Sequence, residues 1–173
     1  MAVNNYLISV ESLKSKGLIH KDADTKLLTI AIKRVQDMII QEALGSPLYR
    51  AMLLHVQNDD WSSYPNYQTL QDDYIIPCLV AHVDFKVSLL LNTKITNKTT
   101  GRASDEYVTS LTDSELSPFQ SELLLDAGFY KERLIGYLKD DCGTMFSEYV
   151  EAITRTNHDL KKSTKGYTGQ WWV

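Results

Sequence analysis

The stretch LLTIAIKRVQDMIIQEALGSPLYRAMLLHV, residues 27–56, decides the fold. Its apolar residues recur at spacings of three and four, the period of an amphipathic helix. Those that form the stripe are Leu28, Ala31, Val35, Met38 and Ile39. The spacing predicts a helix that begins after an N-cap at Asp22 or Asp24, buries this stripe and ends at Leu44-Gly45.

The residues after this helix predict a sharp turn into a second one. Gly45 is a helix-stop residue, Ser46 can cap the next helix, and Pro47 suits its first position, where the missing N–H removes no hydrogen bond. We therefore expect a second helix from Pro47 to about Val56, which turns back at once.

Before this pair, Ser9 is a candidate N-cap for a helix over residues 10–16, which Gly17 would end in a left-handed turn. After the pair, the polar segment 57–66 predicts a surface loop that Trp61 and Tyr64 pin to the body.

A central helix of about 25 residues is predicted next, with one apolar face and a bend at Pro77. That face consists of Leu70, Tyr74, Cys78, Ala81, Phe85, Ser88 and Leu89.

The pattern then changes, because threonines and turn residues over 92–110 favour a β-hairpin or arm. Asp113 opens a last long helix that ends near Asp140-Asp141 or bends at Gly143, and a further helical turn or two is expected over 144–153. Its expected apolar face is Leu116, Phe119, Leu123, Ala127, Tyr130, Leu134, Tyr137 and Leu138. The predicted fold is mainly α: a small helical bundle over residues 1–153 with a projecting β-hairpin or arm, and an extended C-terminal tail over 154–173.

Composition narrows the function classes. The chain has 173 residues, 43% of them hydrophobic and 23% charged, which suits one soluble globular domain. A net charge of −4 gives no basic field for nucleic acid. Apolar runs are too short for a membrane span, and the N-terminal residues show no secretory signal. Cys78 and Cys142 are expected to be buried free thiols.

No catalytic or metal-binding pattern stands out. Phosphate-loop, dinucleotide, nucleophile-elbow and zinc-protease motifs are absent from the sequence. His82 lies four residues from Cys78, but two ligands on one helix do not complete a site. The pairs Asp72-Asp73 and Asp140-Asp141 are expected to be solvated helix surface or a helix end. We therefore predict a protein that is not an enzyme and has no metal or cofactor.

The C-terminal tail is the informative exception. After a polar linker it carries Tyr167, Gln170, Trp171, Trp172 and Val173. Aromatic side chains of this size dominate interface energetics when buried. The tail is therefore predicted to bind a partner, and the alternative is that the tryptophans fold back onto the core of their own subunit.

Several stretches resemble one protein family. They are Ala31-Ile32-x3-Gln36-x2-Ile39-x4-Leu44-Gly45-Ser46-Pro47-Leu48-Tyr49-x3-Leu53, then Ile95-Thr96-Asn97-Lys98, Tyr130-Lys-Glu-Arg-Leu134-x2-Tyr137-Leu138 and Phe146-Ser-Glu-Tyr149. They are similar to the head-to-tail connector, or adaptor, proteins of tailed bacteriophages, of the type found in Bacteroidetes phages and prophages. The resemblance covers roughly residues 25 to 150. The hairpin lacks the expected glycine after Lys98, and the Trp-Trp ending has no counterpart in the family pattern.

The resemblance implies a structural role in the virion, at the head–tail junction, for a protein made in the host bacterial cytoplasm. It implies a homo-oligomeric ring, dodecameric to match the portal, which binds the portal protein and the next tail or connector protein. DNA would pass through the channel without sequence-specific binding, and no membrane is involved. Subunit contacts are expected from Lys94, Ile95, Lys98 and Arg102 in the hairpin, and Leu44, Gly45, Pro47, Leu48 and Tyr49 form the structural motif. The rival hypothesis is a helical interaction module that binds a peptide or regulatory partner and forms no ring.

Overall fold

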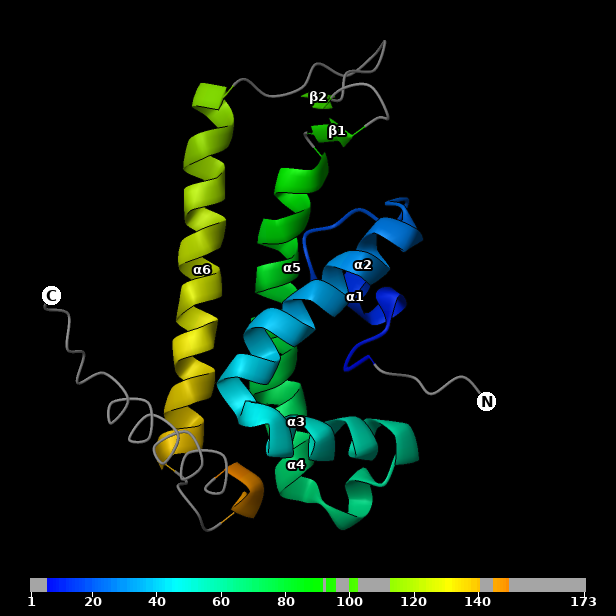
Figure 1. The fold of residues 1–173 in the computed structure, drawn as a ribbon, viewed down its shortest axis with the longest axis vertical. Helices are drawn as coiled ribbons and strands as arrows, with labels where there is room; N and C mark the ends of the chain where they lie inside the picture. The colour runs from blue at the N-terminus through cyan, green and yellow to red at the C-terminus, as the bar shows by residue number, and fades with distance from the viewer. Residues whose placement is uncertain (1–5, 92, 96–99, 103–112, 141–144, 150–173) are drawn as a thin grey trace, which may run out of the picture.

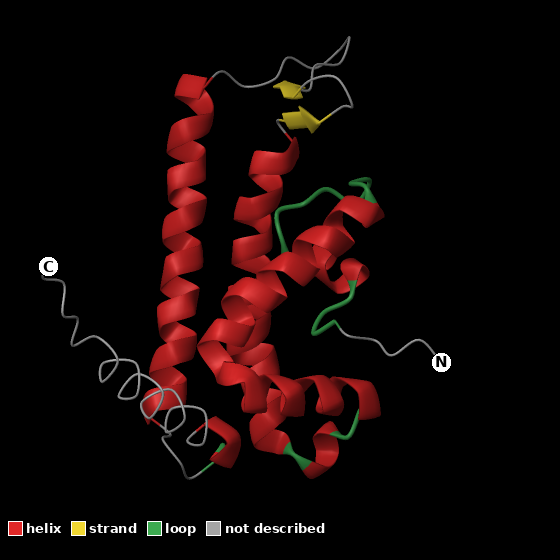
Figure 2. Cartoon of the chain, in the orientation of Figure 1, coloured by secondary structure: helices red, strands yellow, loops and turns green. Residues whose placement is uncertain are grey.

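The computed structural model describes residues 6–91, 93–95, 100–102, 113–140 and 145–149, and nearly all of them are helical (Figures 1 and 2). The helical elements are α1 (Val10–Lys16), α2 (Thr25–Val35), the π-helical η1 (Gln36–Ile40), α3 (Gln41–Asn58), the 3-10 turn η2 (Trp61–Ser63), α4 (Pro65–Thr69), the π-helical η3 (Leu70–Ile75), α5 (Ile76–Leu91) and α6 (Asp113–Asp140). The mainly helical class predicted from the sequence is confirmed.

The helix α5 is the centre of the bundle. It runs beside α6 in the opposite direction, and α2 crosses it on another side (Figure 1). Its buried residues Cys78, Leu79, Val83 and Val87 belong to one hydrophobic core with α2, α3 and the second half of α6. The prediction that this segment is the central helix is therefore confirmed.

The first helices begin where local capping predicts. The Ser9 hydroxyl accepts a hydrogen bond from the Ser12 N–H at 3.1 Å, and the Asp24 carboxylate accepts one from the Lys26 N–H at 2.8 Å. The bounds of α1 are those predicted. The expected left-handed turn at Gly17 is wrong, because Gly17 has an extended backbone with φ of −98°. A Cβ there would lie 2.8 Å from Asp84 Oδ1, so glycine is needed because its backbone packs closely against the Asp84 side chain.

The predicted stripe on α2 is correct only in its first half. Leu28, Ala31 and Val35 are buried, but Met38 is 63% exposed and Ile40, instead of Ile39, is fully buried. The reason is η1, since a π turn holds one more residue than an α turn and shifts the buried face by one position.

The sharp turn at Gly45 is confirmed. Gly45 has φ of 73° and ψ of 155° inside α3, a region that only glycine adopts readily. The helix resumes with Pro47 in its first turn and continues to Asn58, slightly beyond the predicted end.

The next segment is more helical than its composition predicts. Residues 57–66 contain the end of α3, the turn η2 and the start of α4, so the predicted loop is reduced to short connections. Trp61 is half-buried against the core, whereas Tyr64 is 46% exposed. The prediction that Pro77 lies within a long helix is confirmed, because α4, η3 and α5 follow one another without a break over residues 65–91. Pro77 lies in the first turn of α5, directly after the π-helical segment η3.

The last long helix has the predicted bounds. Its residues Leu123, Ala127, Leu134 and Leu138 are buried as expected, but Phe119 is 43% exposed, so the apolar face begins later than predicted. Of the further turn predicted over 144–153, residues 147–149 are helical, and Phe146 is buried in the core.

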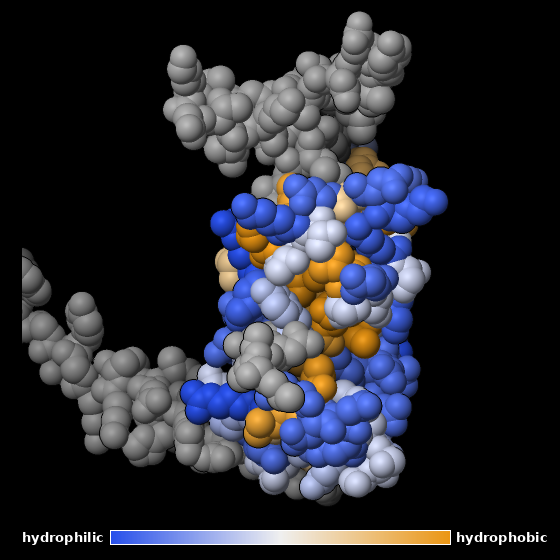
Figure 3. All heavy atoms as spheres, turned by 90° about the vertical axis from the view of Figure 1, so that its right-hand side faces the viewer, coloured by the Kyte–Doolittle hydropathy of each residue, from blue (hydrophilic) through white to orange (hydrophobic). Residues whose placement is uncertain are grey.

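Two short strands follow α5: β1 (Thr93–Ile95) and β2 (Thr100–Arg102) pair antiparallel, with Lys94 opposite Gly101. They do not establish the arm predicted for 92–110, most of which lies outside the described residues. The tail predicted for 154–173 and Cys142 lie outside them as well. Viewed from the side that carries α1 and the start of α2, the body shows a narrow apolar strip between hydrophilic side chains (Figure 3).

Candidate functional site

A buried polar cluster ties the N-terminal segment to the two π-helical segments. The Leu7 N–H donates to Gln36 Oε1 at 2.8 Å, and Gln71 Nε2 donates to the Leu7 carbonyl at 2.6 Å. Gln36 and Gln71 are 0% and 4% exposed. Both backbone groups of Leu7 are thus satisfied by side chains, which is what a buried extended segment requires. We call this arrangement the Leu7 clamp.

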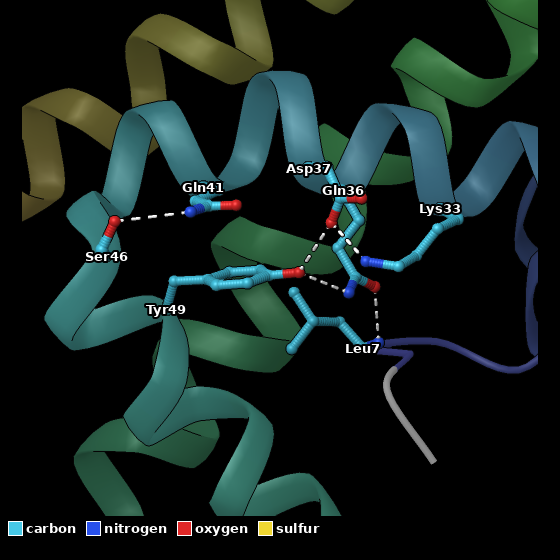
Figure 4. Close-up of polar contacts among 7 residues, drawn as sticks. All are labelled: Leu7, Lys33, Gln36, Asp37, Gln41, Ser46 and Tyr49. Carbon is cyan, nitrogen blue, oxygen red and sulfur yellow. Dashed lines mark hydrogen bonds and ion pairs between the residues drawn. The ribbon is translucent and has the colours of Figure 1, made fainter. Parts of the chain in front are cut away.

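Tyr49 joins the clamp to the kinked helix. Gln36 Nε2 donates to the Tyr49 hydroxyl at 2.7 Å, and that hydroxyl donates to Asp37 Oδ1 at 3.2 Å (Figure 4). Lys33 pairs with the same Asp37 oxygen at 2.5 Å. Burial is the main reason that the pKa of Tyr49 is raised. The kink at Gly45 turns α3 back so that Tyr49 faces Gln36 across the bend (Figure 4).

The structural motif of the resemblance is therefore an internal one. Leu44 and Leu48 are fully buried, Tyr49 is 6% exposed, and Gly45 and Pro47 shape the turn between them. These residues position other elements and offer little surface to a partner.

A hollow of about 310 Å³ lies where the connection between α1 and α2 meets α5 and α6. Asp84 forms part of its wall, is 8% exposed and accepts the Leu18 N–H at 3.1 Å through Oδ2. Burial raises the pKa of Asp84, and the hydrogen bond from Leu18 opposes that rise. Asp72 and Asp126 also line the hollow, whose one lysine is Lys16. Asp84 thus fastens the α1–α2 connection to the central helix at the wall of this hollow.

Aromatic rings join the end of α3 to α4 and the segment after α6. His55 lies 4.5 Å from the ring centroid of Tyr64 and 4.6 Å from that of Tyr67, and its Nδ1 is 2.8 Å from Asp60 Oδ1. The Tyr67 hydroxyl donates to Glu148 at 2.8 Å, and burial and this carboxylate raise the pKa of Tyr67. The cluster holds residues 145–149 against the body.

The side of α6 that faces away from the core carries exposed apolar side chains. Leu125 and Phe129 are 75% and 65% exposed, and their spacing of four residues places both on one face. At 100° per residue, this face lies opposite the buried Leu123, Ala127, Leu134 and Leu138. The exposed acids Glu122, Asp126 and Glu132 border it, together with the exposed Arg133. We call Leu125 and Phe129 the outer row.

A second apolar feature is a groove of about 210 Å³ between α2, α5 and α6. Met38, Ile39, Phe85 and Leu124 supply much of its apolar wall, and Val35 lies among them. Arg34 and Lys86 border the groove, and neither forms an ion pair with another described residue. His82 also lines it, and burial lowers the pKa of His82, so the imidazole is neutral near pH 7. The groove is thus apolar with a positive rim.

Sequence reasoning missed both surfaces. The outer row has a visible signal, since Leu125 and Phe129 fall off the predicted apolar face of their helix. The groove has none, because Met38 belongs to it only through the shift at η1.

The structure describes only some of the residues that the sequence predicts as partner contacts. Tyr167, Gln170, Trp171, Trp172, Val173 and Lys98 lie outside the described residues. Lys94 and Ile95 lie in β1 and Arg102 in β2, as positions on the backbone.

Of the candidate chemical groups, Cys78 is fully buried as predicted, and burial raises its pKa to about 12. His82 Nδ1 is 2.8 Å from the Cys78 carbonyl oxygen, one helical turn away. Asp72 and Asp73 are exposed on η3. Among the described residues, no group of three or more His, Cys, Asp or Glu could hold a metal ion. In the same part of the chain, no helix is both long and apolar enough to cross a membrane.

Comparison with known proteins finds no significant match among curated proteins and none among solved structures. A family model described as "Family of unknown function (DUF6712)" matches residues 40–158, which is more than half of the chain. This span contains the Gly45 kink, the central helix, the groove-lining Phe85 and Lys86, and the outer row. The chain belongs to the DUF6712 family.

Proposed function

We propose that this protein is a structural subunit of a phage head-to-tail connector ring, which binds the portal and extends the DNA channel towards the tail. The observation that carries the proposal is the outer row. Leu125 and Phe129 point away from the subunit's own core, and large exposed apolar side chains on one face mark a contact with another molecule. A subunit that repeats around a ring needs such a contact.

The shape of the subunit agrees with this role. The strands β1 and β2 lie at the end of the bundle where α6 begins, and α6 runs from there to the opposite end (Figure 1). One subunit can therefore present different segments to the proteins above and below a ring. In this proposal residues 92–110 form a β-hairpin arm that contributes subunit contacts, and the aromatic tail over 154–173 docks on the portal or on a neighbouring subunit.

Microscopy and native mass spectrometry test the proposal. The purified protein should form closed rings in negative stain, alone or when a phage portal protein is added. A protein that stays monomeric and never binds that portal contradicts the proposal. A stable one-to-one complex with a peptide and no ring would instead support the rival hypothesis of a helical interaction module.

Deletion of residues 167–173 tests the role of the tail within the same proposal. If Trp171 and Trp172 dock on a partner, the helical circular-dichroism signal and the melting temperature stay nearly unchanged while assembly weakens. If they fold back onto their own core, the melting temperature falls steeply, because truncation of a buried tryptophan to alanine lowers the free energy of unfolding by about 3–5 kcal/mol.

A further inference from the structure

The outer row and the groove are complementary in shape, as a ridge and a hollow, and in charge. The row is a ridge of two large apolar side chains framed by three acids, Glu122, Asp126 and Glu132, and one cation, Arg133. The groove is an apolar hollow bordered by Arg34 and Lys86. Other cations of α2 and α6 are already engaged: Lys33 pairs with Asp37, Lys131 pairs with Glu42 at 2.9 Å, and Arg133 lies over the Tyr74 ring, 4.9 Å from its centroid. Arg34 and Lys86 are therefore the cations left to face an acidic partner on this groove.

The two surfaces of one chain cannot meet each other. Leu124 lines the groove while Leu125 and Phe129 lie on the opposite side of α6 from the core, so the ridge and the groove face different directions. The ridge of one chain can reach the groove of another chain. Such a contact joins two different patches and is heterologous, which generates a closed ring or an open filament when repeated.

We infer that the occupant of the groove is a second copy of this chain. Leu125 and Phe129 of one copy enter the groove between α2, α5 and α6 of the next, and Glu122 and Asp126 face its Arg34 and Lys86. This inference rests on the proposed function and specifies which surfaces form the contact. Burial of the two side chains supplies affinity, whereas the charge frame sets the orientation and excludes the reverse pairing.

Charge reversal on each side gives a sharp test. One variant carries Glu122→Lys and Asp126→Lys, so its ridge and its groove are both basic. The other carries Arg34→Glu and Lys86→Glu, so both surfaces are acidic. Each variant alone should associate at least about tenfold more weakly than the wild type, which corresponds to a loss of about 1.4 kcal/mol. An equimolar mixture should recover association, because every contact in an alternating assembly then joins opposite charges.

The measurement is sedimentation velocity, with circular dichroism to confirm that each variant folds. Association of each variant alone at wild-type strength overturns the inference, and so does a mixture that fails to recover. A matched control reverses Glu11 and Asp22, which are exposed on other segments. Glu11→Lys with Asp22→Lys should leave association unchanged.

Cross-linking gives a second reading that detects weak association. One variant carries Phe129→Cys and the other Met38→Cys, both in a Cys142→Ser background, with Cys78 retained because it is fully buried. At a protein concentration near 1 mM, which captures contacts with millimolar Kd, a short bis-maleimide should join the two variants in mixture and neither alone. Replacement of Met38→Cys by Glu11→Cys should abolish the product. No product in the first mixture overturns the inference.

The outcomes separate this contact from the proposed function. Rings in negative stain without the cross-link mean that another surface builds the ring, so the proposed function stands and the inference falls. The cross-link with open chains and no ring, alone or with portal, means that the contact is real and the connector role is wrong.

Discussion

The Leu7 clamp and the outer row of α6 invert the usual distribution of polar and apolar residues. The clamp buries two glutamines, Gln36 and Gln71, while the outer row exposes Leu125 and Phe129. Most polar atoms of the clamp find partners within the same chain, among them the backbone of Leu7 and the Tyr49 hydroxyl, whereas Gln71 Oε1 is buried with no hydrogen-bond partner among the described residues. The apolar atoms of the outer row find no comparable cover among the described residues. Folding therefore accounts for the clamp, whereas the outer row calls for a second molecule.

The largest expected change in stability comes from a comparison of substitutions on the two faces of α6. Leu134→Ala should lower the free energy of unfolding by about 2–5 kcal/mol, because it leaves a cavity beside α5. Leu125→Ala should change it by less than about 0.5 kcal/mol, as for other exposed positions. Urea denaturation of dilute protein measures both. A large loss with Leu125→Ala would mean that the outer row packs within its own chain, and the comparison would fail.

The Gly45 kink should come next. Gly45→Ala should destabilise the protein by about 1–3 kcal/mol, since φ of 73° with ψ of 155° is strained for any residue with a Cβ. Gly136 in α6 is the matched control, because a Cβ there meets nothing within 4 Å. Gly136→Ala should stabilise the protein by about 0.5–1 kcal/mol through helix propensity. Equal effects of the two substitutions would show that the kink does not depend on glycine.

The clamp itself can be broken at Gln36. Gln36→Leu keeps an apolar side chain of similar size but leaves the buried Leu7 N–H without its acceptor, which should reduce stability by about 1–3 kcal/mol. Gln41 is the control, since its bond to Ser46 at 3.3 Å is exposed. Gln41→Leu should change stability by less than about 0.5 kcal/mol. Thermal melts, with hydrogen exchange at the Leu7 amide, would measure both, and unchanged exchange at Leu7 in Gln36→Leu would contradict the clamp.

The smallest effect concerns Asp84 and pH. Its pKa in the folded state is raised by burial, so the folded state favours the protonated form. Its contribution to stability is present below the unfolded pKa of about 4 and is lost as pH rises through the folded pKa. Asp84→Asn should remove this part of the pH dependence, which lies above about pH 4, and urea titrations at several pH values would measure it. An unchanged pH profile would show that the carboxylate is solvated at the hollow.

Local signals in the sequence predicted much of the fold. Ser9 and Asp24 cap the helices that they precede, Gly45 and Pro47 produce the turn, and α6 spans the predicted residues. Each of these signals acts within about one helical turn, through a cap or a backbone conformation. Gly17 shows the limit of such reasoning, because its role depends on Asp84, which lies 67 positions later in the sequence.

The candidate contact surfaces were predictable only in part. The sequence places Leu125 and Phe129 off the apolar stripe of α6, but it does not say which stripe the bundle buries. It also predicted Met38 to be buried, whereas the π turn η1 moves Met38 to the groove and buries Ile40 instead. Insertion of one residue into a turn depends on how neighbouring helices pack, which no periodic pattern within one helix contains.

By itself the sequence determined the mainly helical class, the caps, the Gly45 turn and the extent of the last helix. The tertiary structure decided that Leu7 is held between Gln36 and Gln71 and that Asp84 fastens the α1–α2 connection. It also decided where the groove lies relative to the outer row. At 100° per residue, Leu124 in the groove is about 120° around α6 from the midpoint of Leu125 and Phe129. The physical reason is range. Capping and periodicity involve residues a few positions apart, whereas the Gln71–Leu7 bond joins residues 64 positions apart and forms only when the helices pack.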